Sequence, residues 1–314
     1  MEQGNQTFAP GFILQGLFHQ AGHEGLIFGV LLFVYLLILQ GNLLIVLLIC
    51  CDTRMLHTPM YFFLSFLALA DICFASSTIP IMLRNLISQD RVISYHGCFF
   101  QMYCFLAFGN TDNFLLATMA YDRYVAICCP LHYKALMNTR RCLLMVSGSW
   151  LLALFQATLY TSMLSSLSFC TSREIPHFFC EFYPVLGLAC SDTTAVKLLA
   201  LTEGVLDFLG PFIFIVASYL HIFVTIMKTS SSSSKHRSFS TCGSHLSVVI
   251  LFYGTLCWIY TQPTSKNKVL PTLMYTVVTP MLNPFIYSLR NNEMKRALRR
   301  LLSRVSSFIH RNWK

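Results

Sequence analysis

The sequence has little charge for its length. Asp, Glu, Lys and Arg make up 11% of its 314 residues, whereas 55% are hydrophobic and the mean hydropathy is +0.60. This balance excludes an ordinary soluble domain and places the chain in a membrane. The polar segments also lack a nucleophile elbow, paired catalytic carboxylates and zinc-ligand spacing, so we expect no enzymatic activity.

The first 25 residues lack the basic segment and the small-residue cleavage site of a secretory signal peptide. The first apolar run must then direct membrane insertion without being removed, and we expect the N-terminus outside the cell. Asn5 opens an Asn-Gln-Thr triplet, which is a glycosylation acceptor only on an extracellular or lumenal segment.

Seven apolar runs approach the length of about 20 residues that crosses a bilayer. They lie at Leu26–Ile49, Pro59–Leu83, Gly97–Ala126, Leu143–Met163, Leu198–Met227, Leu246–Tyr260 and Val269–Leu289. Hydroxyl residues dilute the start of the sixth, and we expect its helix to begin near Arg237, after a flexible serine run at 230–234. No soluble domain, long linker or repeat interrupts the series.

Most of the 22 Lys and Arg residues fall on the side that this topology makes cytoplasmic, as the positive-inside rule requires. The net charge of +9 therefore reflects membrane orientation, and no nucleic-acid partner is needed to explain it. Near the end of the chain, Met294, Ala297 and Leu301 fall opposite Lys295 and Arg299 at helical spacing. This pattern predicts an amphipathic helix that lies along the inner leaflet.

Four of the 13 cysteines fall on the outer side, where disulfides persist. Cys98 opens the third run, and Cys170, Cys180 and Cys190 share the second outer loop. Four cysteines allow three pairings, and the residues alone leave the choice open. Most of the others lie in or beside apolar runs, where cysteine acts as a small hydrophobe.

Two strings at the ends of membrane runs carry the most information. Residues 119–133 read MAYDRYVAICCPLHY, and the Asp122 and Arg123 pair is too costly for the middle of a bilayer, which predicts a cytoplasmic latch. Residues 280–291 read PMLNPFIYSLRN, in which Asn283 and Pro284 bend the helix because proline removes a backbone donor. Tyr287 follows one turn below the bend.

Together with 56–65 (LHTPMYFFLS) and 235–254 (KHRSFSTCGSHLSVVILFYG), these strings cover nearly all of the membrane part in order. They resemble the signatures of olfactory receptors, a branch of the rhodopsin-like G-protein-coupled receptors. The sequence departs from them at Cys129, where most members carry Asn, and at Asp112, where most carry Glu.

The resemblance implies an all-α membrane protein, a seven-transmembrane helix bundle with a short amphipathic eighth helix. We expect an extracellular N-terminus at 1–25, the receptor domain at 26–291, and a cytoplasmic amphipathic helix and tail at 292–314. The resemblance also selects two disulfides, Cys98 with Cys180 and Cys170 with Cys190. The protein should be a multi-pass receptor of the plasma membrane.

A mostly apolar cavity in the outer half of the bundle should bind a small volatile molecule. Glu203 and Asp207, four residues apart on one helix face, favour ligands with an amine or another hydrogen-bond donor. Alternatively, they bond to neighbouring helices or are protonated. The resemblance and helix spacing place these residues around the cavity: Phe105, Leu106, Gly109, Asn110, Glu203, Asp207, Tyr253, Leu256, Cys257, Tyr260 and Thr276.

The resemblance further implies coupling to a heterotrimeric G protein of the stimulatory, olfactory type, which raises cAMP. Ligand binding should favour a state in which the sixth helix swings outward, Asp122 loosens from Arg123, and a G-protein helix enters. An export chaperone is a further expected partner. The switch residues are Asp122, Arg123, Tyr124, Tyr219, Asn283, Pro284 and Tyr287.

Asp71 and Asp112 are intramembrane carboxylates, which are rare and functional by default. We expect them to face each other, and relatives use the position of Asp71 for a sodium ion or a protonation switch. The alternative is a hydrogen-bonded structural pair without an ion.

Other classes of seven-helix protein fit less well. A photoreceptor needs a lysine midway in the seventh run, and 270–289 contains none. A transporter or ion channel, for which Asp71 and Asp112 are the best support, should show repeated halves and matching broken helices, and neither is visible. A receptor of the same fold for a non-odorant molecule outside the nose stays open.

Overall fold

We describe the fold from a computed structural model. It describes residues 11–16, 23–88, 91–170, 173–228, 232–261, 269–289, 293–301 and 303, and the side chains of 232–241, 260, 269, 288 and 289 are not described. The predicted glycosylation site at Asn5 lies outside these residues.

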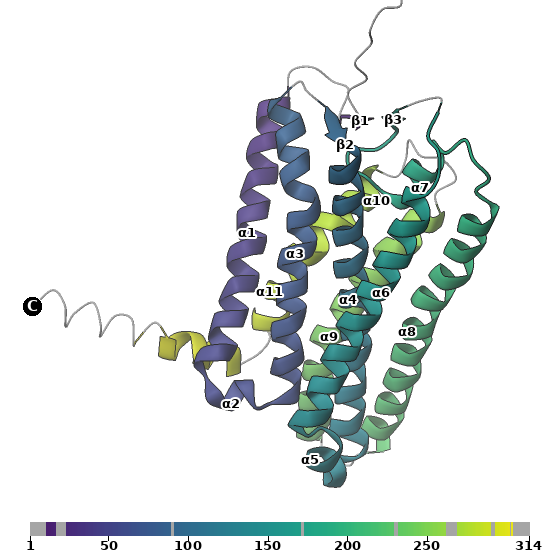
Figure 1. Ribbon diagram of the computed structural model, residues 1–314. Coiled ribbons are helices and arrows are strands. Elements are labelled where there is room, and N and C mark those ends of the chain that lie inside the picture. Colours follow the sequence, from purple (N-terminus) through teal and green to yellow (C-terminus); the bar gives the residue numbers. More distant parts are fainter. Residues whose placement is uncertain are drawn as a thin grey trace, which may run out of the picture.

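Long helices that run side by side form the body of the protein (Figure 1). They are α1 (Glu24–Cys51), α3 (Pro59–Ile87), α4 (Tyr95–Cys128), α6 (Thr139–Ser165), α8 (Thr194–Lys228) and α9 (Ser232–Thr261). The seventh predicted run forms three helical pieces in succession, α10 (Val269–Leu273), the π-helix η3 (Met274–Val278) and α11 (Thr279–Leu289). Each predicted run thus corresponds to helix, and the predicted fold class is confirmed.

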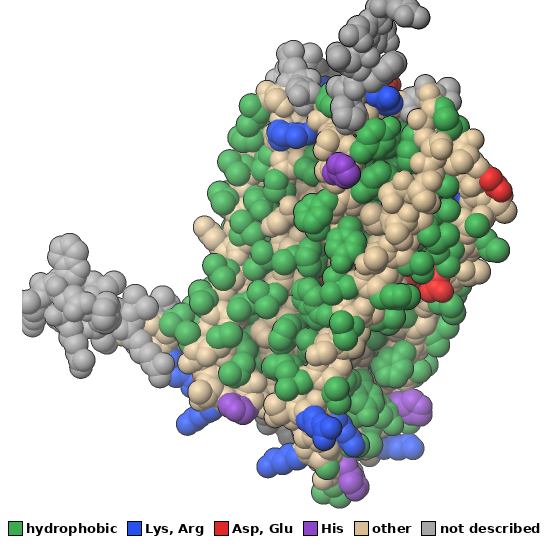
Figure 2. All heavy atoms as spheres, in the orientation of Figure 1, with side chains coloured by type: hydrophobic (Ala, Val, Ile, Leu, Met, Phe, Trp, Pro, Cys, Tyr) green, Lys and Arg blue, Asp and Glu red, His purple; other side chains and the backbone are tan. Residues whose placement is uncertain are grey.

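Among the described residues, five helices are long and apolar enough to cross a membrane. A sixth is counted when α4 is taken with the short helices η1 (Pro130–His132) and α5 (Tyr133–Leu136), which turn away from it by 112°. Large hydrophobic side chains such as Phe33, Leu151 and Phe155 are 62–67% exposed. On the face in Figure 2 such side chains form a belt, and Lys and Arg gather at the two ends. This surface suits a bilayer.

A side chain of the first helix bonds to a backbone carbonyl that Pro284 leaves free in α11, which is helical on both sides of this proline. Pro284 has no backbone N–H, which frees the carbonyl of Pro280 one turn earlier. Asn42 of α1 donates its side-chain N–H to that carbonyl at 3.1 Å. A Cβ added to Gly41 would lie 3.1 Å from the ring of Pro284, so glycine permits the close approach of α1 to α11.

The end of the bundle that the predicted topology places outside, which we call the outer end, carries a small sheet that the sequence did not predict. β1 (Gly11–Leu14) lies between β2 (Val92–Ser94), antiparallel to it, and β3 (Glu174–Ile175), parallel to it. Phe12 is fully buried and makes edge contacts with Tyr95 and Phe169. The N-terminal segment therefore joins the first and second outer loops.

The opposite end holds α2 (Thr53–Leu56), α5 and the helical residues 293–301 (Figure 1). In the last of these, Met294 and Ala297 are buried while Lys295 and Arg299 are exposed, as the amphipathic pattern predicts. Arg300 pairs with Asp52 at 2.5 Å and fixes this helix beside α1. One prediction is wrong: α9 begins at Ser232, so 232–234 of the serine run are helical and the helix starts before Arg237.

Candidate functional site

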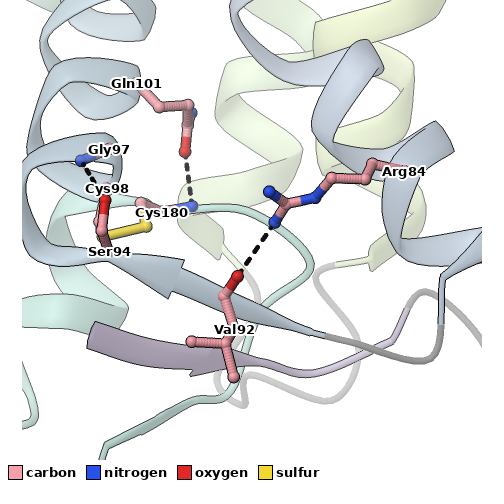
Figure 3. The surroundings of a disulfide bond; sticks show 7 residues. All are labelled: Arg84, Val92, Ser94, Gly97, Cys98, Gln101 and Cys180. Atoms are coloured by element: carbon pink, nitrogen blue, oxygen red, sulfur yellow. Dashed lines mark hydrogen bonds between the residues drawn. A yellow bond between two sulfur atoms is a disulfide. The ribbon is translucent and has the colours of Figure 1, made fainter. Parts of the chain in front are cut away.

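Two disulfides organise the outer end. Cys98 at the start of α4 bonds to Cys180 of the second outer loop, and Cys170 bonds to Cys190 within that loop. Both pairings are those implied by the resemblance. Figure 3 shows the first, where the backbone N–H of Cys180 donates to the side-chain oxygen of Gln101 at 2.7 Å. The loop is thus held against the outer turns of α4.

A cavity of about 150 Å³ opens beneath this loop, between α4, α8 and α9. Glu181, Phe182 and Tyr183, at the start of α7 (Phe182–Leu186), form part of its wall. Burial, and then the charge of Glu181, raise the pKa of the Tyr183 phenol, so it remains a neutral hydroxyl at physiological pH. Most of the lining is apolar, which suits a small, weakly polar ligand.

A chain of polar side chains crosses the cavity wall. Gln156 of α6 donates to Asp207 Oδ1 of α8 at 2.5 Å and accepts from Asn110 of α4 at 3.2 Å. Asn113 donates to the backbone carbonyl of Asp207 at 2.7 Å and accepts a hydrogen bond from the Tyr253 hydroxyl. Asp207 of α8 therefore has two sets of bonds: its carboxylate bonds to Gln156, and its backbone carbonyl is linked through Asn113 to Tyr253 of α9.

The structure brings together six of the residues that the sequence placed around a cavity. Phe105, Leu106, Gly109, Asn110, Asp207 and Leu256 line it. Tyr253 does not line it but bonds to Asn113, which does. A Cβ at Gly109 would come within 2.8 Å of the Tyr275 hydroxyl, so glycine here also permits packing against η3.

Three other expected residues lie elsewhere. Cys257 is exposed and lies in an outer groove between α8 and α9, because one helical step of about 100° separates it from Leu256. Thr276 is buried and donates to the backbone carbonyl of Thr272, and Thr272 lines the cavity instead. Glu203 is half-buried and does not line the cavity. The side chain of Tyr260 lies outside the described residues.

Sequence reasoning missed Thr272, Tyr183 and three further polar members of the site. Gln156, Asn113 and Glu181 either line the cavity or bond to a residue that does. Gln156 and Asn113 are polar residues inside apolar runs, and such residues tend to face the bundle interior, so this signal was present in the sequence.

Beneath the cavity, Asp71 and Asp112 share a small buried space of about 10 Å³ with Asn283. The amide N–H group of Asn283 donates to both oxygens of Asp71, at 2.8 and 3.1 Å. Asp112 Oδ1 and Asn283 Oδ1 are buried with no hydrogen-bond partner among the described residues. Two unpartnered oxygens beside a second carboxylate fit a small cation.

At the opposite end, the predicted latch is closed. Asp122 Oδ2 lies 3.6 Å from Arg123 Nε, and Asp122 Oδ1 accepts the Tyr133 hydroxyl at 2.8 Å. Burial, and then the charge of Asp122, raise the pKa of the Tyr133 phenol, which keeps it a donor. The latch therefore joins α4 to the short helix α5, and Arg123 Nε also contacts Met60 Sδ at 3.3 Å.

His245 connects three helices beside this latch and was not among the predicted switch residues. Its Nδ1 lies 2.6 Å from the Tyr219 hydroxyl of α8, and its Nε2 lies 3.1 Å from the Leu116 carbonyl of α4. Because a carbonyl only accepts, Nε2 carries the proton and Nδ1 accepts from Tyr219. The Tyr287 hydroxyl is buried without a hydrogen-bond partner among the described residues.

Tyr124, the remaining switch residue, packs against α8. Its ring lies 6.0 Å from the His221 ring and joins a cluster with Ile222 and Ile226. Of the predicted switch residues, Asp122, Arg123 and Tyr124 thus lie on α4 and Tyr219 on α8, two helices that His245 of α9 connects. Asn283, Pro284 and Tyr287 lie on α11.

Comparison with known proteins adds an independent finding. Residues 31–305 match the family model described as olfactory receptor. The human protein named Olfactory receptor 7C1 is 51% identical over 98% of this chain and 97% of its own length. The rat protein named Olfactory receptor 1f45 is 49% identical over 96% of this chain and 98% of its own. The human protein named Olfactory receptor 1L4 is 50% identical over 98% of this chain and 100% of its own.

Proposed function

Because the chain belongs to the olfactory receptor family, we propose that it binds small volatile ligands in the cavity beneath the second outer loop and activates a stimulatory G protein, raising cAMP. As a member of this family it is an odorant receptor that couples to a G protein, a multi-pass membrane protein and not an enzyme. We further propose that it works at the plasma membrane, with its N-terminus outside, after export with a chaperone.

The observation that supports this location is an acidic side chain in a mostly apolar wall. Asp207 lines the cavity and belongs to the network that ends at Tyr253. A ligand that bonds to Asp207 would compete with Gln156 for the carboxylate and disturb the contact of Asn113 with α8. The disturbance would reach α9 through Tyr253, whose helix also carries His245.

This arrangement favours ligands with an amine or a hydroxyl donor. In a water-poor cavity a carboxylate bonds strongly to a cationic donor, and a hydrogen bond to a charged group contributes about 1.5–3 kcal/mol. Glu181 adds a second carboxylate to the wall. Neutral odorants without a donor would bind mainly through apolar contact.

We predict that Asp207→Asn weakens the response to amines. The concentration for a half-maximal cAMP response should rise about 10- to 100-fold, because the charged hydrogen bond is lost. The measurement is cAMP output in cells that express the receptor, against volatile amines, alcohols, acids and ketones. Glu203→Gln is the matched control, since Glu203 lies on the same helix and does not line the cavity.

A wild-type response to ketones alone, unchanged by Asp207→Asn, would retain the receptor and reject the acidic anchor. A response lost equally in Asp207→Asn and Glu203→Gln at normal surface level would also reject it, because the loss would not depend on the cavity.

We also propose that Asp71, Asp112 and Asn283 hold a sodium ion, which would neutralise their charge and stabilise the state in which α3, α4 and α11 are closely packed. The support is the pair of unpartnered buried oxygens on Asp112 and Asn283. The alternative is a protonated hydrogen-bonded carboxylate pair, in which Asp112 would need no cation.

Sodium should therefore stabilise the purified receptor. We expect its melting temperature to be a few degrees higher in sodium chloride than in choline chloride at equal ionic strength, because only the folded state binds the ion. Asp112→Asn should abolish the difference. Equal melting temperatures of the wild type in the two salts would contradict the site and favour the protonated pair.

A further inference from the structure

A second hollow lies on the outside of the bundle, between α8 and α9. Its volume is about 480 Å³, and the surface lining it is almost wholly apolar. Val216 and Leu220 form one wall, Val249 and Ile250 the other, and Cys257 lies at one end. We call this hollow the α8–α9 groove. It is separate from the ligand cavity, although Tyr253 and the cavity residue Phe252 are neighbours on α9.

Glycine opens the groove. Gly254 lies in its wall, and a Cβ added there would meet no atom within 4 Å. The flanking side chains face outward, since Leu220 is 61% and Ile250 64% exposed. Because these helices span the membrane, the groove opens to lipid hydrocarbon and not to water. Its occupant must be apolar and must arrive through the bilayer.

An apolar surface on α8 extends from the groove to a basic residue at the end of the helix. From Leu220 the outer face of α8 continues through the exposed Val224 and Met227 to Lys228, the last residue of the helix. Eight residues of helix rise by about 12 Å. An apolar track thus ends at a basic residue, on the side that the proposed topology makes cytoplasmic. An acyl chain with an anionic headgroup matches both parts of this track.

We propose that the α8–α9 groove binds an acyl chain of an anionic phospholipid of the inner leaflet, with Lys228 near the headgroup. The groove is lined in part by Tyr219 and Tyr253, which bond to His245 and Asn113 respectively. A bound chain would hold α8 against α9 and oppose the outward swing of α9. This regulatory consequence rests on the proposed function, whereas binding of the lipid does not.

The test uses full-length receptor in phosphatidylcholine nanodiscs that contain a small fraction of phosphatidylserine with a diazirine in one acyl chain. After illumination, the labelled peptides are mapped by mass spectrometry. We expect label on the groove segments 212–220 and 246–257 in excess of other lipid-facing helices. Unlabelled phosphatidylserine should compete, and phosphatidylcholine should not.

Filling the groove should remove the label. Gly254→Leu places a side chain in the open space, and labelling of the groove should fall about tenfold. Cys257→Phe fills the groove one turn away and serves if the first variant folds poorly. Gly148→Leu is the matched control, because Gly148 of α6 is also exposed with open space around it. Lys228→Gln should weaken competition by phosphatidylserine.

Even labelling of all outward-facing helices, or labelling unchanged by Gly254→Leu and Cys257→Phe, would overturn the proposal. If phosphatidylcholine competes as well as phosphatidylserine does, the proposed preference for an anionic headgroup is wrong. Labelling needs neither odorant nor G protein. The labelling result can therefore be interpreted even if the proposed function is wrong. If both hold, Gly254→Leu should change basal cAMP at equal surface expression, and Gly148→Leu should not.

Discussion

Cys180→Ser should remove nearly all of the receptor from the cell surface. The disulfide with Cys98 closes a loop of 82 residues and lies in the buried core of the outer end. Losing a native disulfide typically costs about 2–5 kcal/mol, a large share of the roughly 5–15 kcal/mol by which proteins are stable. The substitution also buries a hydroxyl in an apolar cluster, at a further cost.

The measurement is antibody staining of an N-terminal tag on intact cells, divided by staining after permeabilisation. Cys170→Ser opens a loop of only 20 residues at a more exposed place, and we expect a smaller loss. Cys257→Ser, at a free and exposed cysteine, should leave the ratio unchanged. Surface staining of Cys180→Ser equal to that of the wild type would show that the loop folds without its bond to α4.

Long elements could be predicted from the sequence because their signal is averaged over many residues. The run Leu26–Ile49 predicts α1 to within two residues at each end. β1, β2 and β3 have four, three and two residues, too few for any periodicity, and they form because distant loops meet. The start of α9 was missed since serine weakens hydropathy without preventing a helix.

The cavity residues were predicted only in part, because the sequence shows the spacing of residues within one helix but not which helices meet. Phe105, Gly109 and Asn110 follow from the register of α4, which Asp112 fixes. The prediction that Cys257 lines the cavity is wrong because a small error in the assumed rotation of α9 moves a side chain from the interior to the lipid-facing surface. The bond from Gln156 to Asp207 joins residues 51 positions apart, and no local pattern encodes such a pair.

The largest effect on signalling should come from the latch between α4 and α5. We expect Arg123→Ala to abolish agonist-stimulated cAMP at normal surface expression, because the proposed mechanism needs its guanidinium to move from Asp122 and meet the G protein. Asp122→Asn should act in the opposite direction. It removes the ion pair with Arg123 and weakens the bond from the Tyr133 hydroxyl, both of which hold the closed state.

If those contacts favour the closed state by about 1–2 kcal/mol, losing them multiplies the equilibrium constant for opening by roughly 5–30. Basal cAMP in Asp122→Asn should rise accordingly, and Tyr133→Phe, which keeps the ion pair, should raise it less. Assays without odorant, normalised to surface receptor, separate these outcomes. The double variant Asp122→Asn with Arg123→Ala should be silent, because freeing the latch has no effect when the arginine that it releases is absent. Basal activity in that double variant would mean that α4 signals through other residues, and the latch would then be a structural contact only.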